Sequence, residues 1–434
     1  MAGLKLNIET LYKKYLESTE ITTDSRDIPV NSIFFALKGD NFNGNDFALD
    51  ALEMGARYAV IDELKFEPDK RFILVDDVLS TLQKLAGYHR KKLDIKVIGI
   101  TGTNGKTTTK ELIQRVLSQR FKSKATIGNL NNHIGVPLTV LSLTDDLDFA
   151  IIEMGANHIG EIASLCEIAS PDFGIITNIG KAHLEGFGGI EGVIKAKSEL
   201  YDFIKQNNNK IFINGDNDIL KKKANGIERV TYGSNKKFYC SGKIVDSFPF
   251  LKLEIRIDDK SYKIESKLTG RYNFENIVAA VCVGSYFKVP DKDILKAIEL
   301  YEPSNNRSQI IKTAKNTIIS DAYNANPSSM DAAINNFSSS SYNNKVLILG
   351  DMFELGSESR KEHQKIIEII KNSGIDSIFL IGPQFQSVCK ENIYKCFGST
   401  SKLMDFLNNE PVVNSTILLK GSRKMQLEKV VGLL

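Results

Sequence analysis

The segment Val97–Leu112, VIGITGTNGKTTTKEL, contains residue types that could bind the phosphates of a nucleotide. An apolar, β-branched run leads into a glycine turn, and a helix is predicted to begin at Lys106. Backbone N–H groups in such a turn attract anions. The common phosphate loop is Gly-x-x-x-x-Gly-Lys-Ser/Thr, but the residue five places before Gly105 is Ile100. The segment therefore predicts a phosphate loop with a different glycine spacing.

Two side chains at the predicted helix start fit the chemistry of ATP. The ammonium of Lys106 would reach the β- and γ-phosphates, and the hydroxyl of Thr107 would bind Mg²⁺. The structural alternative is a capped helix after a turn, which would not require a lysine there. We therefore predict that ATP binds to the loop residues Gly102, Thr103, Asn104, Gly105, Lys106, Thr107 and Thr108.

Four further residues lie at strand ends or on a predicted helix. Glu153 ends the apolar strand FAIIEM, so its carboxylate is placed at the edge of the sheet that also carries the phosphate loop, which suits a magnesium ligand. His183 follows the next strand, where it is either a ligand or a polar surface residue. By spacing alone, Lys197 and Glu199 belong to an exposed helix face with charges paired at i,i+4.

Two charged residues lie further along the chain. Arg307 is either an ordinary loop charge or a phosphate clamp at a domain junction, where ligands tend to bind. Asp321 follows the strand TIIS and precedes AYNANPSS, so it is either an Asx-turn residue or a functional carboxylate. The spacing leaves both alternatives open.

The elements that must position these residues predict an α/β fold with three domains. Residues 1–95 form a small α/β domain, and residues 96–305 form a central, P-loop-like ATPase domain with a parallel sheet covered on both faces. A polar stretch at Glu302–Ser308 marks the next boundary. Residues 306–434 repeat a strand-turn-helix pattern that is typical of a Rossmann-like domain.

The composition excludes several classes of protein. Among the 434 residues, 56 Lys and Arg against 53 Asp and Glu give a net charge of +3, which does not indicate a nucleic-acid partner. The five cysteines have no metal-binding spacing, so reduced thiols are expected. No apolar run approaches the length of a membrane span. We therefore expect a cytoplasmic protein without a membrane span. A monomer is a separate expectation, on which the composition does not bear.

The motifs together resemble one family, the ATP-dependent Mur ligases of bacterial cell-wall synthesis. TGTNGKTTT is similar to the family's phosphate loop, which has this shifted glycine spacing, and TNIGKAHLEGFG and LTGRYNFENIVAA are similar to its central motifs. The resemblance covers nearly the whole chain. It implies a ligase of peptidoglycan synthesis, and hence of cell shape and cell division, that forms an amide from an acid and an amine while converting ATP to ADP and phosphate.

Within this family, five segments most resemble the enzymes that act last: GNLNNHIGVPLT, IEMGANHIGEI, DAYNANPSSMDAA, LGDMFELG and LLKGSR. These enzymes join D-alanyl-D-alanine to UDP-N-acetylmuramoyl-tripeptide through an acyl phosphate. Enzymes that add the third residue carry a Asp-Asn-Pro-Arg stretch, which is absent here. The alternatives are another Mur-type amide ligase, such as the third-residue-adding enzyme or a folylpolyglutamate synthase, and a nucleotide-dependent switch.

The resemblance also implies roles for individual residues. Thr107 and Glu153 would hold one Mg²⁺, and His183 would lie near a second, beside a carbamylated Lys197. Lys106, His183, Lys197 and Arg307 would serve catalysis. Asn276 would contact adenine, Arg307 a phosphate, and Asp321 the nucleotide from the third domain. The N-terminal domain would bind the UDP-sugar substrate, and the contacts expected with that substrate are Ser25, Arg26, Asn131 and Asn132.

One departure from the family pattern affects the expected uridine pocket. The segment Asn41–Phe47, NFNGNDF, has asparagines where relatives often show Asp-Gly-His. The resemblance therefore says least about this part of the N-terminal domain.

Overall fold

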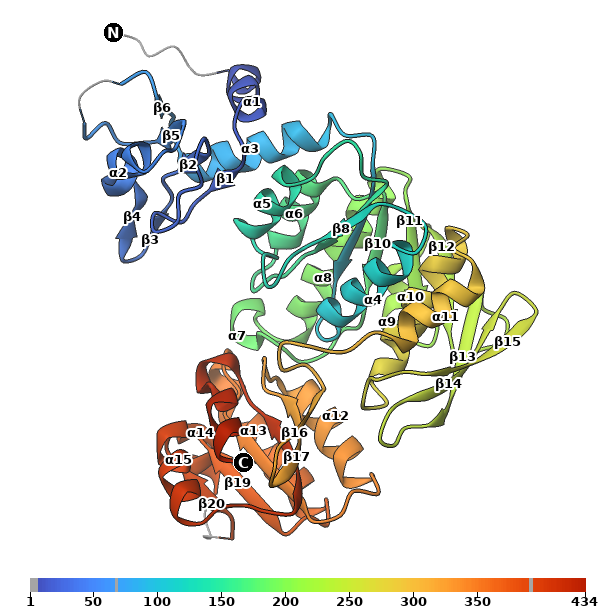
Figure 1. Cartoon of the computed structure of the whole chain (residues 1–434). Helices are drawn as coiled ribbons and strands as arrows, with labels where there is room; N and C mark the ends of the chain where they lie inside the picture. Colours follow the sequence, from blue (N-terminus) through green and yellow to red (C-terminus); the bar gives the residue numbers. More distant parts are fainter. Residues whose placement is uncertain (1–6, 67–68, 390–392) are drawn as a thin grey trace. The chain divides into compact units, whose positions relative to one another are not determined.

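The computed structural model describes residues 7–66, 69–389 and 393–434 (Figure 1). Two compact units are present. The first comprises Met1–Gly99, Phe121–Gly155 and Glu161–Phe173, and the second comprises Ile100–Arg120, Ala156–Gly160 and Gly174–Leu434. The α/β class predicted from the sequence is confirmed, while the exact domain bounds stay a prediction.

The first unit begins with a four-stranded parallel sheet in the order β1-β2-β5-β6. The strands are β1 (Ile21–Thr22), β2 (Ile33–Phe35), β5 (Tyr58–Ile61) and β6 (Phe72–Leu74), and the helices are α1 (Ile8–Leu16), α2 (Ala48–Glu53) and α3 (Val78–Arg90).

The core of this sheet is built from alternating small and large apolar side chains. Phe34, Ala59 and Ile61 from the strands pack with Ala51 and Leu52 of α2, and all five are buried. Burial of these side chains on one face of a short sheet is what holds a domain of this size together.

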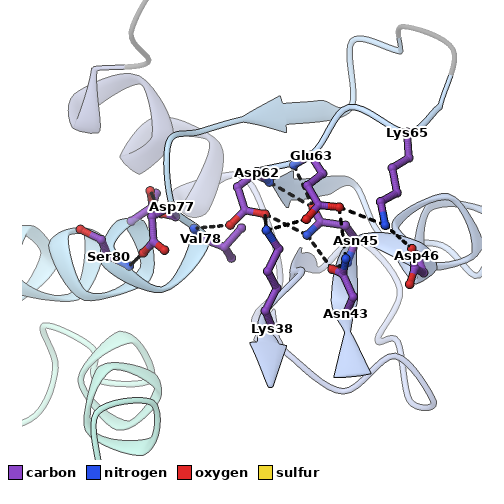
Figure 2. Close-up of polar contacts among 11 residues, drawn as sticks. Lys38, Asn43, Asn45, Asp46, Asp62, Glu63, Lys65, Asp77, Val78 and Ser80 are labelled. Atoms are coloured by element: carbon purple, nitrogen blue, oxygen red, sulfur yellow. Dashed lines mark hydrogen bonds and ion pairs between the residues drawn. The ribbon is translucent and has the colours of Figure 1, made fainter. Parts of the chain in front are cut away.

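A small hairpin, β3 (Lys38–Gly39) and β4 (Phe42–Asn43), lies beside the buried side chain of Asn45 (Figure 2). The Asn45 amide nitrogen donates to Asn43 Oδ1 and to Asp62 Oδ1, each at 2.9 Å. Its carbonyl oxygen accepts the backbone N–H groups of Asp62 at 3.1 Å and Glu63 at 3.3 Å. Asn45, in the segment that departs from the family pattern, is therefore a structural link between the hairpin and the end of β5.

Asp62 extends this link to the neighbouring helix. Its second carboxylate oxygen accepts the N–H of Val78, the first residue of α3, and Lys38 Nζ lies 2.8 Å from Oδ1 (Figure 2). Burial favours the neutral acid, but the hydrogen bonds from Lys38, Asn45 and Val78 outweigh it and lower the pKa of Asp62. Hairpin, strand and helix thus share one ionised carboxylate.

The rest of the first unit follows the linker after α3. Strand β8 (Ser123–Ala125) pairs in parallel with β9 (Phe149–Glu153), and helices α5 (Gly135–Leu141) and α6 (Glu161–Ala169) accompany them. Strand β9 is buried along its whole length. An apolar strand of this kind is typical of a sheet covered on both faces, as the sequence indicated.

Strand β7 (Lys96–Thr101) leads into the second unit, where α4 (Lys106–Leu117) starts directly after the glycine turn. Helix α10 (Asn273–Tyr286) packs against α4 so closely that a Cβ on Gly284 would lie 2.3 Å from a Val116 methyl group. Helix α11 (Asp291–Glu299) contacts both. The helix that follows the phosphate loop is therefore fixed by a tight apolar interface.

In this central part the first strand pairs are parallel and the last two are antiparallel. Strand β11 (Lys210–Asn214) pairs in parallel with β12 (Glu228–Gly233), which continues in parallel to β13 (Cys240–Asp246). The next two, β14 (Lys252–Ile257) and β15 (Lys260–Glu265), are antiparallel, an extension that the expected parallel sheet did not include. The remaining elements are β10 (Phe173–Ile176), α7 (Leu184–Phe187), α8 (Ile190–Gln206) and α9 (Asp218–Lys223).

The C-terminal part contains a six-stranded sheet in the order β16-β17-β21-β18-β19-β20 (Figure 1). Only β16 is antiparallel, so the Rossmann-like expectation is confirmed. The strands are β16 (Gln309–Lys312), β17 (Asn316–Asp321), β18 (Lys345–Gly350), β19 (Ser377–Ile381), β20 (Lys395–Phe397) and β21 (Ser415–Lys420). The α-helices are α12 (Pro327–Ser338), α13 (Ser359–Lys371), α14 (Pro383–Val388) and α15 (Thr400–Asn409).

The order of this sheet places two charged residues side by side at its carboxyl edge. Asp321 ends β17 and Lys420 ends β21, and the two are register partners.

Within the described residues, no helix is both long and apolar enough to cross a membrane.

The Asn45 link predicts a measurable loss of stability. Replacing Asn45 by Ala would leave buried N–H and carboxylate groups of Asp62 and Glu63 with fewer partners, which costs about 1–3 kcal/mol of unfolding free energy. Urea denaturation followed by tyrosine fluorescence measures this loss. Asn41→Ala, at an exposed position in the same segment, is the control and should change the free energy by less than about 0.5 kcal/mol. Equal stability of the two variants would contradict the structural role of Asn45.

Candidate active site

The phosphate loop of the second unit occupies residues 102–105, between β7 and α4. Gly102 has φ +143° and Gly105 has φ +79°, conformations that L side chains rarely adopt. A Cβ at Gly102 would lie 2.0 Å from Thr177 Oγ1, and one at Gly105 would lie 2.5 Å from Asn276 Oδ1. Glycine is therefore required at both positions, by backbone conformation and by close approach.

The residues that follow β10 hold the loop in place. Thr103 donates its N–H to the carbonyl of Asn178 at 2.9 Å, and Asn104 donates its N–H to the Asn178 side chain at 3.0 Å. Thr177 Oγ1 donates to the carbonyl of Asn104 at 2.6 Å, and Gly180 donates its N–H to Thr103 Oγ1 at 2.9 Å. These hydrogen bonds fix the backbone of the loop, and a preorganised cradle of N–H groups favours anion binding.

Lys106 bends back over this cradle. Its Nζ donates to the carbonyl of Gly102 at 2.8 Å and to the carbonyl of Thr103 at 3.2 Å. Thr107, next along the helix, is buried. The ammonium and the start of α4 therefore lie at one loop, as predicted for a site that binds phosphate.

Asn276 lies below the loop rather than at the surface. It is buried, its Oδ1 accepts the hydroxyl of Thr109 at 3.0 Å, and its Nδ2 donates to Asn273 Oδ1 at 2.8 Å. These bonds and the close approach to Gly105 give Asn276 a role in supporting the loop. The contact with adenine that the resemblance implies stays a prediction.

The beginning of α12 contacts the same loop. Asn326 caps this helix through a capping box with Ser329, and its Nδ2 donates to Asn104 Oδ1 at 2.8 Å. Ser328 Oγ accepts the N–H of Lys181 at 2.9 Å. The C-terminal part of the chain therefore touches the phosphate loop through the first turn of one helix.

A buried glutamate in α13 adds an ion pair to this contact. Glu362, whose side chain is only 4% exposed, lies 2.8 Å from the Nζ atoms of both Lys181 and Lys365. Burial favours the neutral acid, but the hydrogen bonds from the two lysines outweigh it and lower the pKa of Glu362. Lys181 thus connects the loop after β10 to α13.

His183 has a strained backbone and an acidic neighbour. Its φ is +50°, and the side chain is about one quarter exposed. The carboxylate of Glu354, itself at φ +62°, contacts His183 Nδ1, and this contact lowers the pKa of Glu354. Nδ1 is buried and has no hydrogen bond of regular geometry, so the two side chains meet in a close polar contact. Two left-handed non-glycine residues in contact are typical of a functional site.

Lys197 is buried in α8, with 2% of its surface exposed. The prediction from spacing alone, an exposed helix face, is therefore wrong for this residue, because the helix turns its side chain inward. Its ammonium lies 5.3 Å from the centre of the Phe187 ring, and the His183 ring lies 6.3 Å from the same centre. Lys197 and His183 thus both lie next to one aromatic side chain. Glu199, half-buried, accepts the N–H of Gly160 at 2.6 Å.

Arg307 lies in the boundary loop before β16, and Asp321, at the end of β17, contacts that loop. Asp321 Oδ1 accepts the N–H of Ser308 at 3.2 Å, and Oδ2 forms an ion pair with Lys420 Nζ at 2.5 Å. The guanidinium of Arg307 stacks on the ring of Tyr323, 3.6 Å from its centre. The structure thus brings Arg307 and Asp321 to one boundary loop.

In the first unit, the predicted metal ligand Glu153 is buried and held by its neighbours. Its Oε1 accepts the side-chain N–H of Asn131 at 2.8 Å, and its backbone N–H donates to Thr126 Oγ1 at 2.9 Å. Asn132 Oδ1 accepts the N–H groups of Ile134 and Gly135 at the start of α5. Asn131 and Asn132 therefore have local structural roles, and their contact with a substrate stays a prediction.

Ser25 is half-buried and Arg26 is exposed in the N-terminal domain. The Arg26 side chain is 88% exposed and forms an ion pair with Asp24 at 2.7 Å. Hydrogen bonds from Arg26 lower the pKa of Asp24 to about 2. Exposure leaves the guanidinium accessible, as a substrate contact would require.

The donor types fit a magnesium site. Thr107 offers a hydroxyl and Glu153 a carboxylate, both hard oxygen donors. In the described ranges no three His, Cys, Asp or Glu side chains gather as a metal-binding group. Mg²⁺ usually takes one or two protein carboxylates and completes its shell with phosphates and water, so the roles of Thr107 and Glu153 stay predictions.

Sequence reasoning missed four residues of the second unit. Asn178 follows β10 at a strand end, the signal that identified Glu153, and Asn326 precedes a proline with a serine three residues later, which is a capping signal. Tyr323 lies within the motif quoted above. Glu354 carries no signal, because its contact with His183 depends on two segments far apart in the chain.

Comparison with known proteins matches three family models. Residues 17–90 match "Mur ligase family, catalytic domain", residues 100–284 match "Mur ligase middle domain", and residues 306–423 match "Mur ligase, glutamate ligase domain". The three matched segments follow the order of the three domains predicted from the sequence.

Individual relatives match along nearly the whole chain. UDP-N-acetylmuramoyl-tripeptide--D-alanyl-D-alanine ligase of Bacillus subtilis is 35% identical over 95% of this chain and 92% of its own length. A crystal structure of MurF from Acinetobacter baumannii has a TM-score of 0.88 at 27% identity, covering 99% of this chain and 98% of that one. MurF from Thermotoga maritima, solved in complex with ADP, has a TM-score of 0.85 at 25% identity, covering 96% and 97%. The chain therefore belongs to the Mur ligase family.

Proposed function

We propose that this protein is an ATP-dependent ligase that joins D-alanyl-D-alanine to UDP-N-acetylmuramoyl-tripeptide in peptidoglycan precursor synthesis. The observation that carries the proposal is the 35% identity, over 95% of the chain, to a relative named for this reaction. The rigid phosphate cradle with Lys106 beside it supports the use of ATP.

The reaction has two steps. The carboxylate of the tripeptide attacks the γ-phosphate of ATP, which releases ADP and leaves an acyl phosphate. The amine of D-alanyl-D-alanine then attacks the acyl carbon, and loss of phosphate forms the amide. Because both partners of the first step are anionic, the protein must supply positive charge rather than a covalent nucleophile.

The residues that supply this charge are those of the second unit. Lys106 would exchange its contacts with the loop carbonyls for phosphate oxygens, and Arg307 would bind a phosphate from the boundary loop. Mg²⁺, where bound, would neutralise phosphate charge, with Thr107 and Glu153 as ligands and a second ion near His183. The loop N–H groups and α4 would orient the nucleotide.

The third domain would complete the site after the substrates bind. The first turn of α12 already contacts Asn104, and Lys181 is paired with Glu362. These contacts would bring Asp321 and the Lys420 segment toward the nucleotide and exclude water, which otherwise hydrolyses an acyl phosphate.

A carbamylated Lys197 is part of this proposal. Carbon dioxide would react with the neutral amine to give a carbamate and a proton. Lys197 is buried in α8, away from bulk water. The product is an anion with two oxygens, which suits a magnesium ion near His183.

We further predict that the protein acts as a monomer and in the cytoplasm.

Substrate choice tests the proposed reaction directly. With UDP-N-acetylmuramoyl-tripeptide and ATP, phosphate release should require D-alanyl-D-alanine and should not be supported by L-lysine, diaminopimelate or glutamate. A malachite-green assay combined with mass spectrometry of the product measures both. Release with a single amino acid would indicate the third-residue-adding or folylpolyglutamate type, and release without any cosubstrate would indicate a nucleotide switch.

Lys106→Ala should abolish most of the turnover. The cradle would lose the ammonium that balances charge at the γ-phosphate, a loss of about 2–4 kcal/mol in transition-state stabilisation, or roughly 30- to 1,000-fold in kcat. Steady-state kinetics at saturating substrates measure this. Turnover of the variant at the wild-type rate would reject the role of Lys106.

Lys197→Ala should reduce turnover strongly, and formate or acetate should restore part of it by replacing the carbamate oxygens. Lys195→Ala, an exposed lysine in the same helix, is the matched control and should keep the wild-type rate. A high-resolution map of the magnesium-bound enzyme should show the added group on Nζ. An unmodified ammonium in that map, or full activity of Lys197→Ala, would contradict the role.

A further inference from the structure

The loop Ser304–Gln309, between the central part and β16, is unusually strained. Three of its residues, Asn305, Asn306 and Ser308, have φ values of +58°, +55° and +52°. Non-glycine residues adopt this left-handed conformation at a cost, and they keep it only where the surrounding structure holds it. Such clusters are found at functional sites, so the question is what this loop presents.

Four hydrogen bonds hold the strained loop. Asp321 Oδ1 accepts the N–H of Ser308 at 3.2 Å, and the hydroxyls of Tyr272 and Ser308 lie 2.9 Å apart. Ser320 Oγ donates to Asn306 Oδ1 at 3.0 Å, and the N–H of Tyr323 donates to the carbonyl of Asn306 at 3.2 Å. The loop is therefore fastened to β17 and to the segment that follows it.

The residue that this loop presents is Arg307. Its guanidinium carbon lies 3.6 Å from the centre of the Tyr323 ring, the distance of direct face-to-face stacking. A guanidinium stacked in this way donates its N–H groups along its edge, so the ring holds the group without using any donor. The hydrogen bond from the Tyr323 backbone N–H to the Asn306 carbonyl keeps the Tyr323 ring next to the loop.

Arg307 has no acidic partner in the part of the chain that the structure describes. None of the ion pairs or side-chain hydrogen bonds found there includes its guanidinium. Asp321, the nearby carboxylate, is already paired with Lys420 and bonded to Ser308. Arg423, which lies 5.8 Å from the same Tyr323 ring, contrasts with it, because Arg423 is paired with Glu428 at 3.4 Å. The donors of Arg307 are thus available to an external anion.

We propose that Tyr323 is a positioning residue, which holds the Arg307 guanidinium flat and ready for a phosphate oxygen of ATP. This inference rests on the proposed function, in which Arg307 binds a phosphate. Tyr323 acts through Arg307, because its ring occupies the face of the guanidinium and leaves the edge free. A lysine at position 307 could supply the charge, but it has no planar group to stack on the ring.

Four variants of the full chain test the proposal: Tyr323→Phe, Tyr323→Leu, Arg307→Ala, and Tyr323→Leu combined with Arg307→Ala. The measurements are kcat/KM for ATP in the ligase assay and the affinity for a non-hydrolysable ATP analogue with Mg²⁺ by calorimetry. Tyr323→Phe keeps the ring and should stay within about twofold of wild type. Tyr323→Leu should lose about tenfold, and Arg307→Ala about 100-fold. The double variant should match Arg307→Ala, because in this proposal the ring affects the nucleotide only through Arg307.

Each other outcome has a distinct meaning. Wild-type behaviour of Tyr323→Leu, or a double variant whose loss is the product of the two single losses, overturns the positioning role. A loss in Tyr323→Phe as large as in Tyr323→Leu also overturns it, because the hydroxyl would then be the active group. Wild-type behaviour of Arg307→Ala instead rejects the phosphate role in the proposed function.

A fifth variant keeps the test decisive if Tyr323→Leu does not fold, as judged by its thermal unfolding. Arg307→Lys keeps the charge and removes the stacked plane, and it should lose at least as much as expected for Tyr323→Leu. Full activity of Arg307→Lys overturns the proposal, because charge alone would then be sufficient.

Discussion

The close approach of the phosphate loop to two other segments is the constraint on which the site depends. Thr177 leaves no room for a Cβ at Gly102, and Asn276 leaves none at Gly105. The backbone of the loop therefore lies directly against these two side chains. This contact fixes the loop against the residues after β10 and against α10 before any nucleotide is present. A cradle that is already rigid does not need to reorganise when charge develops on the phosphate.

The loop is also the place where the C-terminal part of the chain meets the nucleotide-binding part. Asn104 donates its backbone N–H to Asn178 Oδ1, and its backbone carbonyl accepts a hydrogen bond from the Thr177 hydroxyl. Its side-chain oxygen accepts a hydrogen bond from the Asn326 amide. One residue therefore contacts both the support of the loop and the first turn of α12.

Local pattern was sufficient where a residue's role depends on its own segment. The apolar strand and glycine turn predicted that a helix begins at Lys106, and it does; strand ends correctly located Glu153 and Asp321. Pattern was insufficient where the role depends on packing. Helical spacing predicted that Lys197 lies on an exposed face of α8. The structure places it on the buried face of this helix, which neighbouring elements cover. Similarly, no local signal pairs His183 with Glu354, since the contact joins segments about 170 residues apart.

Three cations near the boundary and the loop are held in physically different ways. The ammonium of Lys106 bonds to two loop carbonyls, and that of Lys420 is paired with Asp321, so each must give up a protein partner before it can bind a phosphate. The loss of an existing bond reduces the net gain from a new one. The Arg307 guanidinium is held by an aromatic face, which uses no hydrogen-bond donor. Stacking therefore fixes a charge in place without reducing its capacity to bind an anion, and the strain of residues 305–308 is the cost of placing that charge at the boundary.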